Sequence, residues 1–331
     1  MATPTRAGKA PPARERERKT LEKIAYLFPG QGSQAVGMGL EFHQEYDEVR
    51  EFFDMVDEVC KKRISRLCFS GPMEELTRTA ICQPAVAAAS LAALVAIQKA
   101  GGPPPDFAAG HSLGEYAALC AAGALDREAT MRLVRRRGEL MHADAVAHSG
   151  VMYAIVGLSI DEVRDLVSGV EGRVAVANHN TPTQVVISGT AQAVEKAAQL
   201  AKKAGAREIP LAVSGPWHSE LMARAAKEFA SYLDHHYTLE KPSIPVVPNV
   251  TATPETDPAV LAECLKKQIT SPVLWVDSIR ALREAGVDTF VEVGPRRVLT
   301  GLVKKILGKD DSKLFSVGDM KGLEAWISAS T

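Results

Sequence analysis

The sequence lacks the features that mark membrane-spanning, disulfide-bonded and nucleic-acid-binding proteins. No uninterrupted apolar run reaches the roughly 18 residues that a membrane-spanning helix needs. The five cysteines are odd in number and form no C-x-x-C pair, which argues against a disulfide framework or a zinc site and indicates a reducing compartment. The net charge of −1 gives no general attraction to nucleic acids or membranes. These absences predict a cytoplasmic protein that binds neither.

The composition that remains is that of a large globular protein. A chain of 331 residues with 46% hydrophobic and 24% charged residues suits one large α/β domain or two domains. Residues 1–20 differ, because they are rich in Pro, Ala and Arg, carry alternating charges over 14–19, and lack the apolar segment of a secretory signal. We predict that residues 1–20 form a disordered tail outside the fold.

The stretch from Gly110 to Gly114 reads G-x-S-x-G, with Ser112 at its centre. A short apolar run, 107–109, precedes it, and a helical run of small residues, 116–124, follows it. In this strand–turn–helix context a serine is held on a sharp turn with its hydroxyl exposed, and the helix N-terminus offers free N–H groups beside it. The stretch predicts a nucleophile with half of an oxyanion hole. A glycine-rich turn with an incidental serine is the alternative.

A second glycine-rich turn, 29–34, follows the predicted strand 24–28. Gly30, Gly32 and Ala35 nearly spell the dinucleotide-binding fingerprint. However, Pro29 lies inside the turn, and further glycines delay the helix that would receive a pyrophosphate. The other interpretation is a loop whose N–H groups face a reaction centre, with Gln31 as the candidate donor.

Strands and helices alternate along the chain, which is typical of a mostly parallel sheet covered on both faces. Residues 148–214 break this pattern with a βαββαβ order, the ferredoxin-like plan. We therefore predict a ferredoxin-like small domain over 148–214, inserted into a large domain over 21–147 and 215–320. The predicted elements of the large domain include strands 24–28, 107–109, 245–247 and 289–293 and helices 41–60, 81–99, 126–144, 258–268 and 275–285. Those of the small domain are strands 151–156, 173–177, 184–188 and 207–213 and helices 159–167 and 190–204.

A serine nucleophile needs a base, and the sequence offers eight histidines. His111 lies inside the serine turn, and we expect it to point away from the serine side chain. His218 lies in a loop at the return from the small domain, where a base in a cleft between domains would be found. The order Ser–Asp–His of a plain α/β-hydrolase does not fit, because no evident Asp loop precedes His218.

Arg137 ends a cluster of arginines on the helix after the serine turn. A buried guanidinium is costly without an anion, and its fork can hold a carboxylate through two parallel hydrogen bonds. An inward-facing Arg137 therefore predicts an acidic acyl substrate. For most of the cluster, a solvated helix face is the simpler interpretation.

Taken together, these residues resemble the malonyl-CoA:acyl-carrier-protein transacylase family and its polyketide acyltransferase relatives over about residues 22–320. The resemblance is specific because several separate motifs occur in order. They are FPGQGSQ at 28–34, Gln83-Pro84, GHSLGEY at 110–116, Arg137-Gly138, NHNTP at 178–182, the His218-Ser219 loop, Asn249-Val250 and EVGP at 292–295.

The resemblance implies a role for each matching position. Ser112 would be the acylated nucleophile and His218 its base, with the backbone carbonyl of Gln268 orienting the imidazole in place of an Asp. The N–H groups of Gln31 and Leu113 would form the oxyanion hole, and Arg137 would bind the malonyl carboxylate. Asn178 and Asn180 would line the small-domain side of the cleft. The family's fold, an α/β-hydrolase-like core with a ferredoxin-like insert, agrees with the strand order above.

The sequence departs from the family pattern at Trp217, where the family often has Phe or Ser, and at Gly215. A bulky Trp217 would favour malonyl over methylmalonyl groups. The resemblance implies malonyl transfer from a coenzyme A thioester to an acyl carrier protein, in fatty-acid or polyketide synthesis, with no metal or redox cofactor. We expect a monomer. The alternatives are a serine thioester hydrolase or esterase with the same Ser–His pair, a non-catalytic carrier-docking module, and a nucleotide-binding protein.

Overall fold

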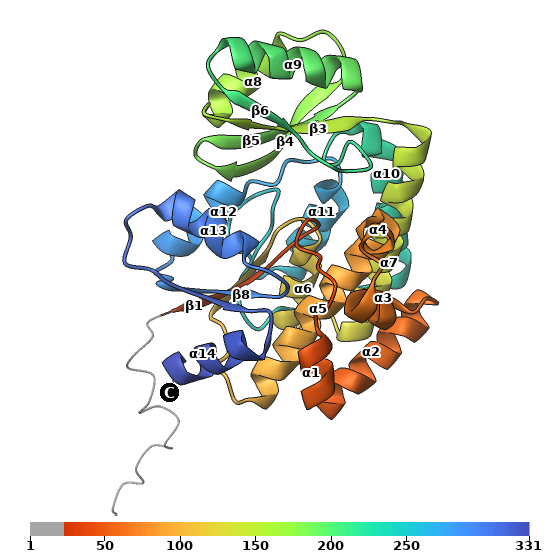
Figure 1. The fold of residues 1–331 in the computed structure, drawn as a ribbon, viewed down its shortest axis with the longest axis vertical. Helices are drawn as coiled ribbons and strands as arrows, with labels where there is room; N and C mark the ends of the chain where they lie inside the picture. Colours follow the sequence, from red (N-terminus) through yellow and green to blue (C-terminus); the bar gives the residue numbers. More distant parts are fainter. Residues whose placement is uncertain (1–22, 331) are drawn as a thin grey trace, which may run out of the picture.

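The computed structural model describes residues 23–330, so the predicted tail, 1–20, lies outside the described residues. The larger of two sheets has five strands in the order β7-β2-β1-β8-β9, and every neighbouring pair is parallel (Figure 1). The strands are β1 (Ile24–Phe28), β2 (Phe107–Gly110), β7 (Val246–Val247), β8 (Thr289–Val293) and β9 (Lys313–Val317). A parallel sheet was predicted, but β9 was not.

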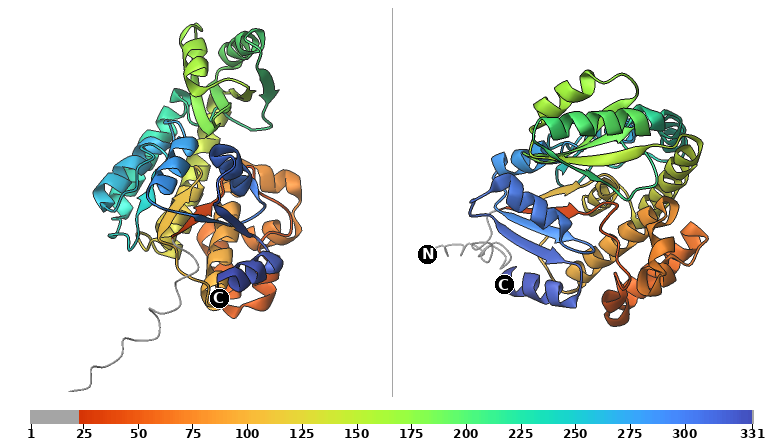
Figure 2. Two further views of the ribbon diagram at one scale, coloured as in Figure 1. Left: turned by 90° about the vertical axis from the view of Figure 1, so that its left-hand side faces the viewer. Right: turned by 45° about the horizontal axis from the view of Figure 1, so that its top comes forward.

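Alternate residues of β1 enter different cores, because successive strand side chains point to opposite faces. Tyr26 and Phe28 join the core against the long helices, whereas Ala25 and Leu27 join the core on the other face. The first face is covered by α5 (Thr79–Lys99), α6 (Gly114–Ala121) and α7 (Arg127–Ala147), and the second by α12 (Trp275–Glu284) and α13 (Val298–Leu307). The sheet is thus the middle layer of three (Figures 1 and 2).

Helix α5 is long and apolar enough to span a membrane, but 94% of its apolar stretch is buried inside the protein. Its residues contact α2, α3, α6 and α7. Most of its apolar side chains are small alanines, which allow neighbouring helices to approach closely. This burial on all sides explains the absence of a polar face.

The remaining helices surround this core. They are α1 (Leu40–Glu45), α2 (Asp47–Cys60), α3 (Ile64–Ser70), α4 (Met73–Thr77), α10 (Ala223–His236), α11 (Pro258–Gln268) and α14 (Met320–Ser330), with a 3-10 turn at Glu220–Met222. The prediction of one helix over 41–60 is wrong, because Tyr46 adopts an extended conformation between α1 and α2. Helix α14 begins where the predicted large domain ends, and its Trp326 packs against Tyr26 and Phe315.

The smaller sheet is antiparallel, with the strand order β4-β5-β3-β6. Its elements are β3 (Val151–Val156), α8 (Ile160–Ser168), β4 (Val174–Thr181), β5 (Gln184–Gly189), α9 (Ala191–Lys203) and β6 (Arg207–Pro210). This order confirms the predicted ferredoxin-like insert, which lies at the top of Figure 1. A capping box opens α8, since Ser159 and Glu162 exchange hydrogen bonds.

Strand β4 extends beyond its predicted end at residue 177 and joins the two parts of the molecule. The Val273 N–H donates to the Ala177 carbonyl, and the His179 N–H donates to the Val273 carbonyl, both at 2.9 Å. Val273 belongs to the segment between α11 and α12 of the large part. Asn178 and Asn180, which lie beyond the predicted end of this strand, are therefore fixed on β4 beside the large domain.

Candidate active site

Ser112 lies on a sharp turn between β2 and α6. Its φ of 53° is in the left-handed region, which few residues other than glycine adopt. The chain crosses itself closely here, because a Cβ on Gly110 would overlap the backbone of Gly114, and one on Gly114 would overlap the Phe28 carbonyl. The two flanking glycines are thus required by this close approach, as the G-x-S-x-G pattern predicts.

His218 faces Ser112, with its Nε2 2.8 Å from the serine Oγ. Its Nδ1 lies 3.0 Å from the Gln268 carbonyl oxygen and 2.9 Å from that of Ser271. Because both carbonyls only accept hydrogen bonds, Nδ1 carries the proton and the Nε2 lone pair faces the serine hydroxyl. Burial, aided by the nearby Arg137 charge, lowers the pKa of His218 to about 3. The imidazole is therefore neutral and able to accept a proton.

Arg137 is the one member of its arginine cluster that turns inward, with 1% of its surface exposed. Its Nη2 donates to Ser112 Oγ at 3.0 Å and to Gln268 Oε1 at 3.1 Å, and its Nη1 donates to Gln83 Oε1 at 2.6 Å. Its Nε has no partner among the described residues. All these acceptors are neutral. Burial lowers the pKa of Arg137, although nearby Tyr116 and Glu115 oppose this shift.

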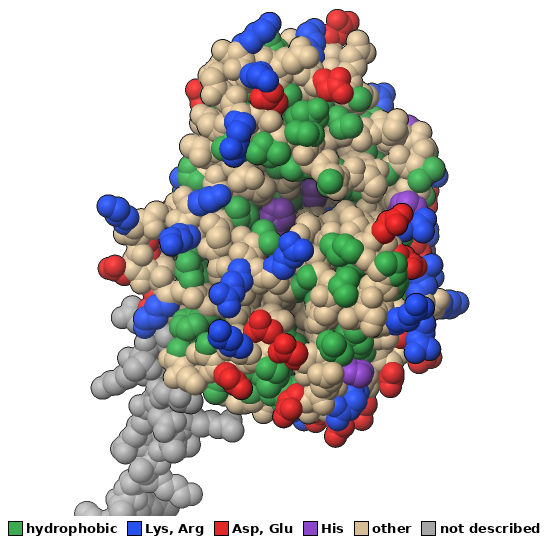
Figure 3. All heavy atoms as spheres, in the orientation of Figure 1, with side chains coloured by type: hydrophobic (Ala, Val, Ile, Leu, Met, Phe, Trp, Pro, Cys, Tyr) green, Lys and Arg blue, Asp and Glu red, His purple; other side chains and the backbone are tan. Residues whose placement is uncertain are grey.

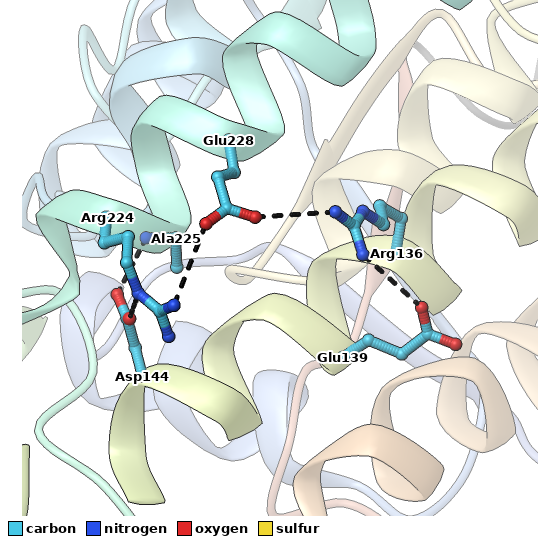
Figure 4. Close-up of polar contacts among 6 residues, drawn as sticks. All are labelled: Arg136, Glu139, Asp144, Arg224, Ala225 and Glu228. Carbon is cyan, nitrogen blue, oxygen red and sulfur yellow. Dashed lines mark hydrogen bonds and ion pairs between the residues drawn. The ribbon is translucent and has the colours of Figure 1, made fainter. Parts of the chain in front are cut away.

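The other arginines of the cluster face outward and pair with acidic side chains. Arg132 pairs with Glu128, and Arg135 pairs with Glu139. Arg136 bridges Glu139 and Glu228, as Figure 4 shows. Within residues 23–330, no carboxylate forms such an ion pair with Arg137.

The backbone N–H groups of Gln31 and Leu113 have no hydrogen-bond acceptor in the part of the chain that the structure describes. Leu113 directly precedes α6, so its N–H points out of the helix N-terminus. Gln31 lies in the turn after β1, and its side-chain Nε2 donates to Thr79 Oγ1 at 3.2 Å. Both residues line the cleft that contains Ser112.

This cleft is a cavity of about 160 Å³ between the two sheets. Histidine side chains are visible in the hollow below the small domain in Figure 3. Eight of the nine predicted site residues line the cavity, namely Gln31, Ser112, Leu113, Arg137, Asn178, Asn180, Trp217 and His218. Gln268 lies behind it, fully buried, and contacts the others through hydrogen bonds.

His111 was expected to point away from the Ser112 side chain, but both residues line the same cavity. His111 lines the cavity, and its Nε2 lies 2.9 Å from Asn180 Oδ1. Its ring also packs on Trp275, with 5.4 Å between the ring centroids. Because Asn180 belongs to β4, this contact joins the serine turn to the small domain, which no local sequence pattern indicates.

Two further residues that the sequence did not assign to the site lie directly under the serine turn. Asn249 accepts from the Ser112 N–H and donates to the Gly110 carbonyl, both at 2.6 Å. Glu115 is buried and accepts from the Asn249 N–H. Asn249 occurs in one of the family motifs, which was the only signal for it in the sequence.

Among the described residues, no group of three or more His, Cys, Asp or Glu side chains is arranged to hold a metal.

The chain matches the acyl transferase domain family over residues 25–323. It is 46% identical to the malonyl CoA-acyl carrier protein transacylase of Bacillus subtilis, over 93% of this chain and 97% of that protein. It is 41% identical to the transacylase of the same name from Haemophilus influenzae, over 92% of this chain and 98% of that protein.

Solved structures agree with these similarities. An acyl-carrier-protein S-malonyltransferase from Burkholderia pseudomallei superposes with a TM-score of 0.88 at 40% identity, over 93% of this chain and 100% of that chain. A malonyl-transacylase in complex with a type II PKS acyl-carrier protein also gives a TM-score of 0.88, at 39% identity over 93% of this chain and 99% of that chain. With its serine turn, its histidine and its matching length, the chain belongs to the acyl transferase domain family.

Proposed function

We propose that the protein transfers a malonyl group from malonyl-CoA to the phosphopantetheine thiol of an acyl carrier protein through a malonyl-Ser112 intermediate. The observation that carries this proposal is the buried Arg137, which donates to Ser112 Oγ and has only neutral partners. A carboxylate on the acyl group supplies the missing counter-ion at this position. The relatives that bear the transacylase name support the same reaction.

In the first half-reaction, Ser112 Oγ attacks the thioester carbonyl of malonyl-CoA while His218 Nε2 takes the hydroxyl proton. The tetrahedral intermediate collapses, the C–S bond breaks, and His218 returns the proton to the coenzyme A sulfur. Malonyl-Ser112 remains. The Oγ–Nε2 distance of 2.8 Å places the unprotonated Nε2 of His218 within reach of this proton.

The oxyanion of the tetrahedral intermediate is stabilised by the N–H groups of Gln31 and Leu113. Both line the cleft, and neither is used by another acceptor among the described residues. Loss of one such donor typically costs about 3 kcal/mol of transition-state stabilisation. Asn178 and Asn180 line the opposite wall and would contact the acyl group.

In the second half-reaction, the phosphopantetheine thiol gives its proton to His218, and the thiolate attacks the ester carbonyl of malonyl-Ser112. Collapse of the intermediate breaks the C–Oγ bond, and Ser112 regains its proton from His218. The same base thus serves both halves. The chemistry requires no metal or redox cofactor, and it supplies malonyl groups for fatty-acid or polyketide synthesis.

The alternative is a thioester hydrolase or esterase, in which water replaces the carrier thiol. The comparisons favour transfer, since the relatives are named as transacylases and one solved relative is bound to an acyl-carrier protein. An acidic carrier protein and coenzyme A thioesters are therefore the proposed partners. A cytoplasmic monomer remains a prediction.

Intact-protein mass spectrometry after brief incubation with malonyl-CoA tests the proposal. We expect a malonyl adduct on the native chain, no adduct on Ser112→Ala, and transfer of the adduct to a carrier protein. Arg137→Ala should lose malonyl loading while its slower acetyl loading is retained. Steady release of coenzyme A without an adduct or transfer would instead identify a hydrolase.

A further inference from the structure

A fully buried carboxylate lies behind the serine turn, outside the reaction described above. Glu115 begins the first turn of α6 and is 1% exposed. Its Oε2 accepts from the Asn249 N–H at 2.9 Å and from Gln268 Nε2 at 2.8 Å. It does not line the cleft, so it cannot contact an acyl group there. Of the two residues that it holds, Asn249 contacts the backbone of Ser112, and Gln268 contacts the side chains of His218 and Arg137.

The first of these contacts leads to the nucleophile. Asn249 accepts from the Ser112 N–H and donates to the Gly110 carbonyl, so its amide spans the serine turn. Ser112 has a φ of 53°, a conformation that costs of order 1–3 kcal/mol and persists only where the surroundings fix it. Glu115 anchors the backbone of Asn249 and therefore fixes the amide that holds this turn.

The second contact leads to the base and to the guanidinium. The Gln268 carbonyl accepts from His218 Nδ1, and its side-chain Oε1 accepts from Arg137 Nη2. Its Nε2 donates to the Ser112 carbonyl at 3.0 Å as well as to Glu115. Because Glu115 Oε2 is an acceptor, it requires the NH₂ end of the Gln268 amide, which leaves the oxygen for Arg137.

We propose that Glu115 is a positioning residue, which sets the relative placement of Ser112, His218 and Arg137 through Asn249 and Gln268. The proposal deepens the acyl-transfer function proposed above and rests on it for the roles of these three groups. Glu115 acts through the nucleophile and the base, so its loss slows attack on any electrophile. Arg137, by contrast, would bind the malonyl carboxylate, so its loss should slow malonyl loading more than attack on an uncharged electrophile.

The network depends on the acceptor oxygen of Glu115 rather than on its charge. Burial is the main reason why the pKa of Glu115 is raised to about 7, although the Asn249 N–H, Gln268 and Arg137 oppose this shift. The carboxyl group is thus partly protonated near neutral pH. Oε2 accepts both hydrogen bonds in either state, provided that the proton is on the other oxygen. An amide at this position keeps the acceptor, whereas a thioether of similar length removes it.

The test compares Glu115→Gln with Glu115→Met, two replacements of similar volume. The first readout is the rate at which a fluorophosphonate labels Ser112, because this uncharged probe needs neither Arg137 nor coenzyme A. The second readout is the rate of malonyl loading. We expect Glu115→Met to slow both by about 100-fold, the cost of a misplacement of roughly 1 Å. Glu115→Gln should recover at least a tenth of the native rates.

Glu292 provides a matched control. It is the other fully buried glutamate of the described residues, and it accepts from the N–H groups of Val298, Leu299 and Thr300 at the start of α13. Glu292→Met should lower the melting temperature, yet leave the rate of fluorophosphonate labelling per folded molecule within about twofold of the native rate.

Folded Glu115→Met protein that is labelled at the native rate would overturn the proposal, and so would a Glu115→Gln variant that is as slow as Glu115→Met. If Glu115→Met does not fold, the comparison of Glu115→Gln with Asn249→Ala tests the proposal instead. Asn249→Ala should slow labelling, whereas Glu115→Gln should not. If Glu115→Met is labelled more slowly but malonyl-CoA does not load even the native chain, the positioning role of Glu115 is supported and the proposed function is refuted.

Discussion

The two residues that exchange the proton, Ser112 and His218, both have positive φ angles, 53° and 57°. Such strain is kept only where neighbouring contacts fix the backbone. Ser112 is fixed by the Asn249 amide and by the glycines of its turn. His218 is fixed by the carbonyls of Gln268, at the end of α11, and of Ser271. The rigidity of the pair therefore comes from residues that are distant in the sequence.

The low pKa of His218 leads to a testable pH dependence. Because burial and Arg137 hold this pKa at about 3, protonation does not inactivate the base when the pH falls through 6.5. We expect the rate of Ser112 labelling by an uncharged fluorophosphonate to stay flat from pH 8 to pH 5. Arg137→Ala removes a positive charge that lowers the pKa of His218. The pH at which this variant loses its labelling rate should therefore rise toward neutral. A midpoint near pH 6.5 in the native chain would contradict this assignment.

A second prediction concerns Trp217 and the choice of acyl group. Its indole lines the cavity and folds back over Gly215, where a Cβ would lie only 2.6 Å from the ring carbon Cη2. We expect the ring to take up space that an α-methyl branch of the acyl group would need. Trp217→Ser should therefore raise methylmalonyl loading relative to malonyl loading, as measured by intact mass after incubation with an equal mixture of the two thioesters. An unchanged ratio would remove Trp217 from the pocket's selectivity.

The sequence located Ser112, His218 and Arg137 because each belongs to a local motif on a turn, a loop or a helix. It did not reveal that His111 faces Asn180, or that Glu115 lies under the turn. These contacts depend on the docking of β4 and of the 249 and 268 segments against the serine turn. Hydrophobic periodicity carries no information about such long-range contacts between polar side chains.

Among the elements, β8 and α11 were predicted to the residue, since a buried apolar run and a Pro-started helix have clear ends. The single helix predicted over 41–60 was not correct. The apolar pattern continues across Tyr46, whereas the helical backbone is interrupted there. Strand β9 was missed because none of its residues before Val317 is fully buried. An edge strand that is partly exposed has a weak hydrophobic pattern.

The junction between α7 and α10 gives a prediction about stability. Asp144 of α7 is fully buried and accepts from Arg224 Nε at 2.6 Å and from the Ala225 N–H at 2.7 Å, at the N-terminus of α10 (Figure 4). Asp144→Ala leaves a buried helix N–H without an acceptor, which costs about 2 kcal/mol. We expect urea unfolding to show this loss.

Asp161→Ala is the control for Asp144→Ala. Asp161 also pairs with an arginine, Arg164, but the two side chains are 85% and 51% exposed. Such a pair contributes less than about 1 kcal/mol. If both variants lose equally little free energy of unfolding, the Asp144 contact does not secure α10.

Considered as a whole, the molecule places its cleft where the parallel sheet, the antiparallel sheet and the 268–273 segment meet. Four pairs of basic residues in the sequence are candidates for docking an acidic carrier protein, namely Lys202-Lys203, Lys266-Lys267, Arg296-Arg297 and Lys304-Lys305. Lys202 is paired with Glu208, and Lys266 is paired with Asp234 and Glu263. Arg296 and Arg297 are exposed and form no ion pair with the described residues.

Arg296 and Arg297 also adjoin the segment that leads to Gln31. They follow the turn at Gly294, where a Cβ would lie 2.9 Å from the ring of Pro29, two residues before Gln31. Lys and Arg side chains flank the hollow in Figure 3. This placement favours Arg296 and Arg297 as the docking charges, since a carrier bound here would direct its phosphopantetheine arm toward Ser112.

The double variant Arg296→Glu, Arg297→Glu should raise the KM for an acidic carrier protein about tenfold, equivalent to about 1.4 kcal/mol. Malonyl loading from malonyl-CoA should be unchanged, because charges at the rim of an interface act on association with the partner and not on chemistry in the cleft. Lys266→Glu, at a lysine already engaged by two carboxylates, is the control and should leave both constants near their native values. A double variant that slows loading and carrier transfer to the same extent would show that these arginines support the adjoining Gln31 loop rather than the carrier.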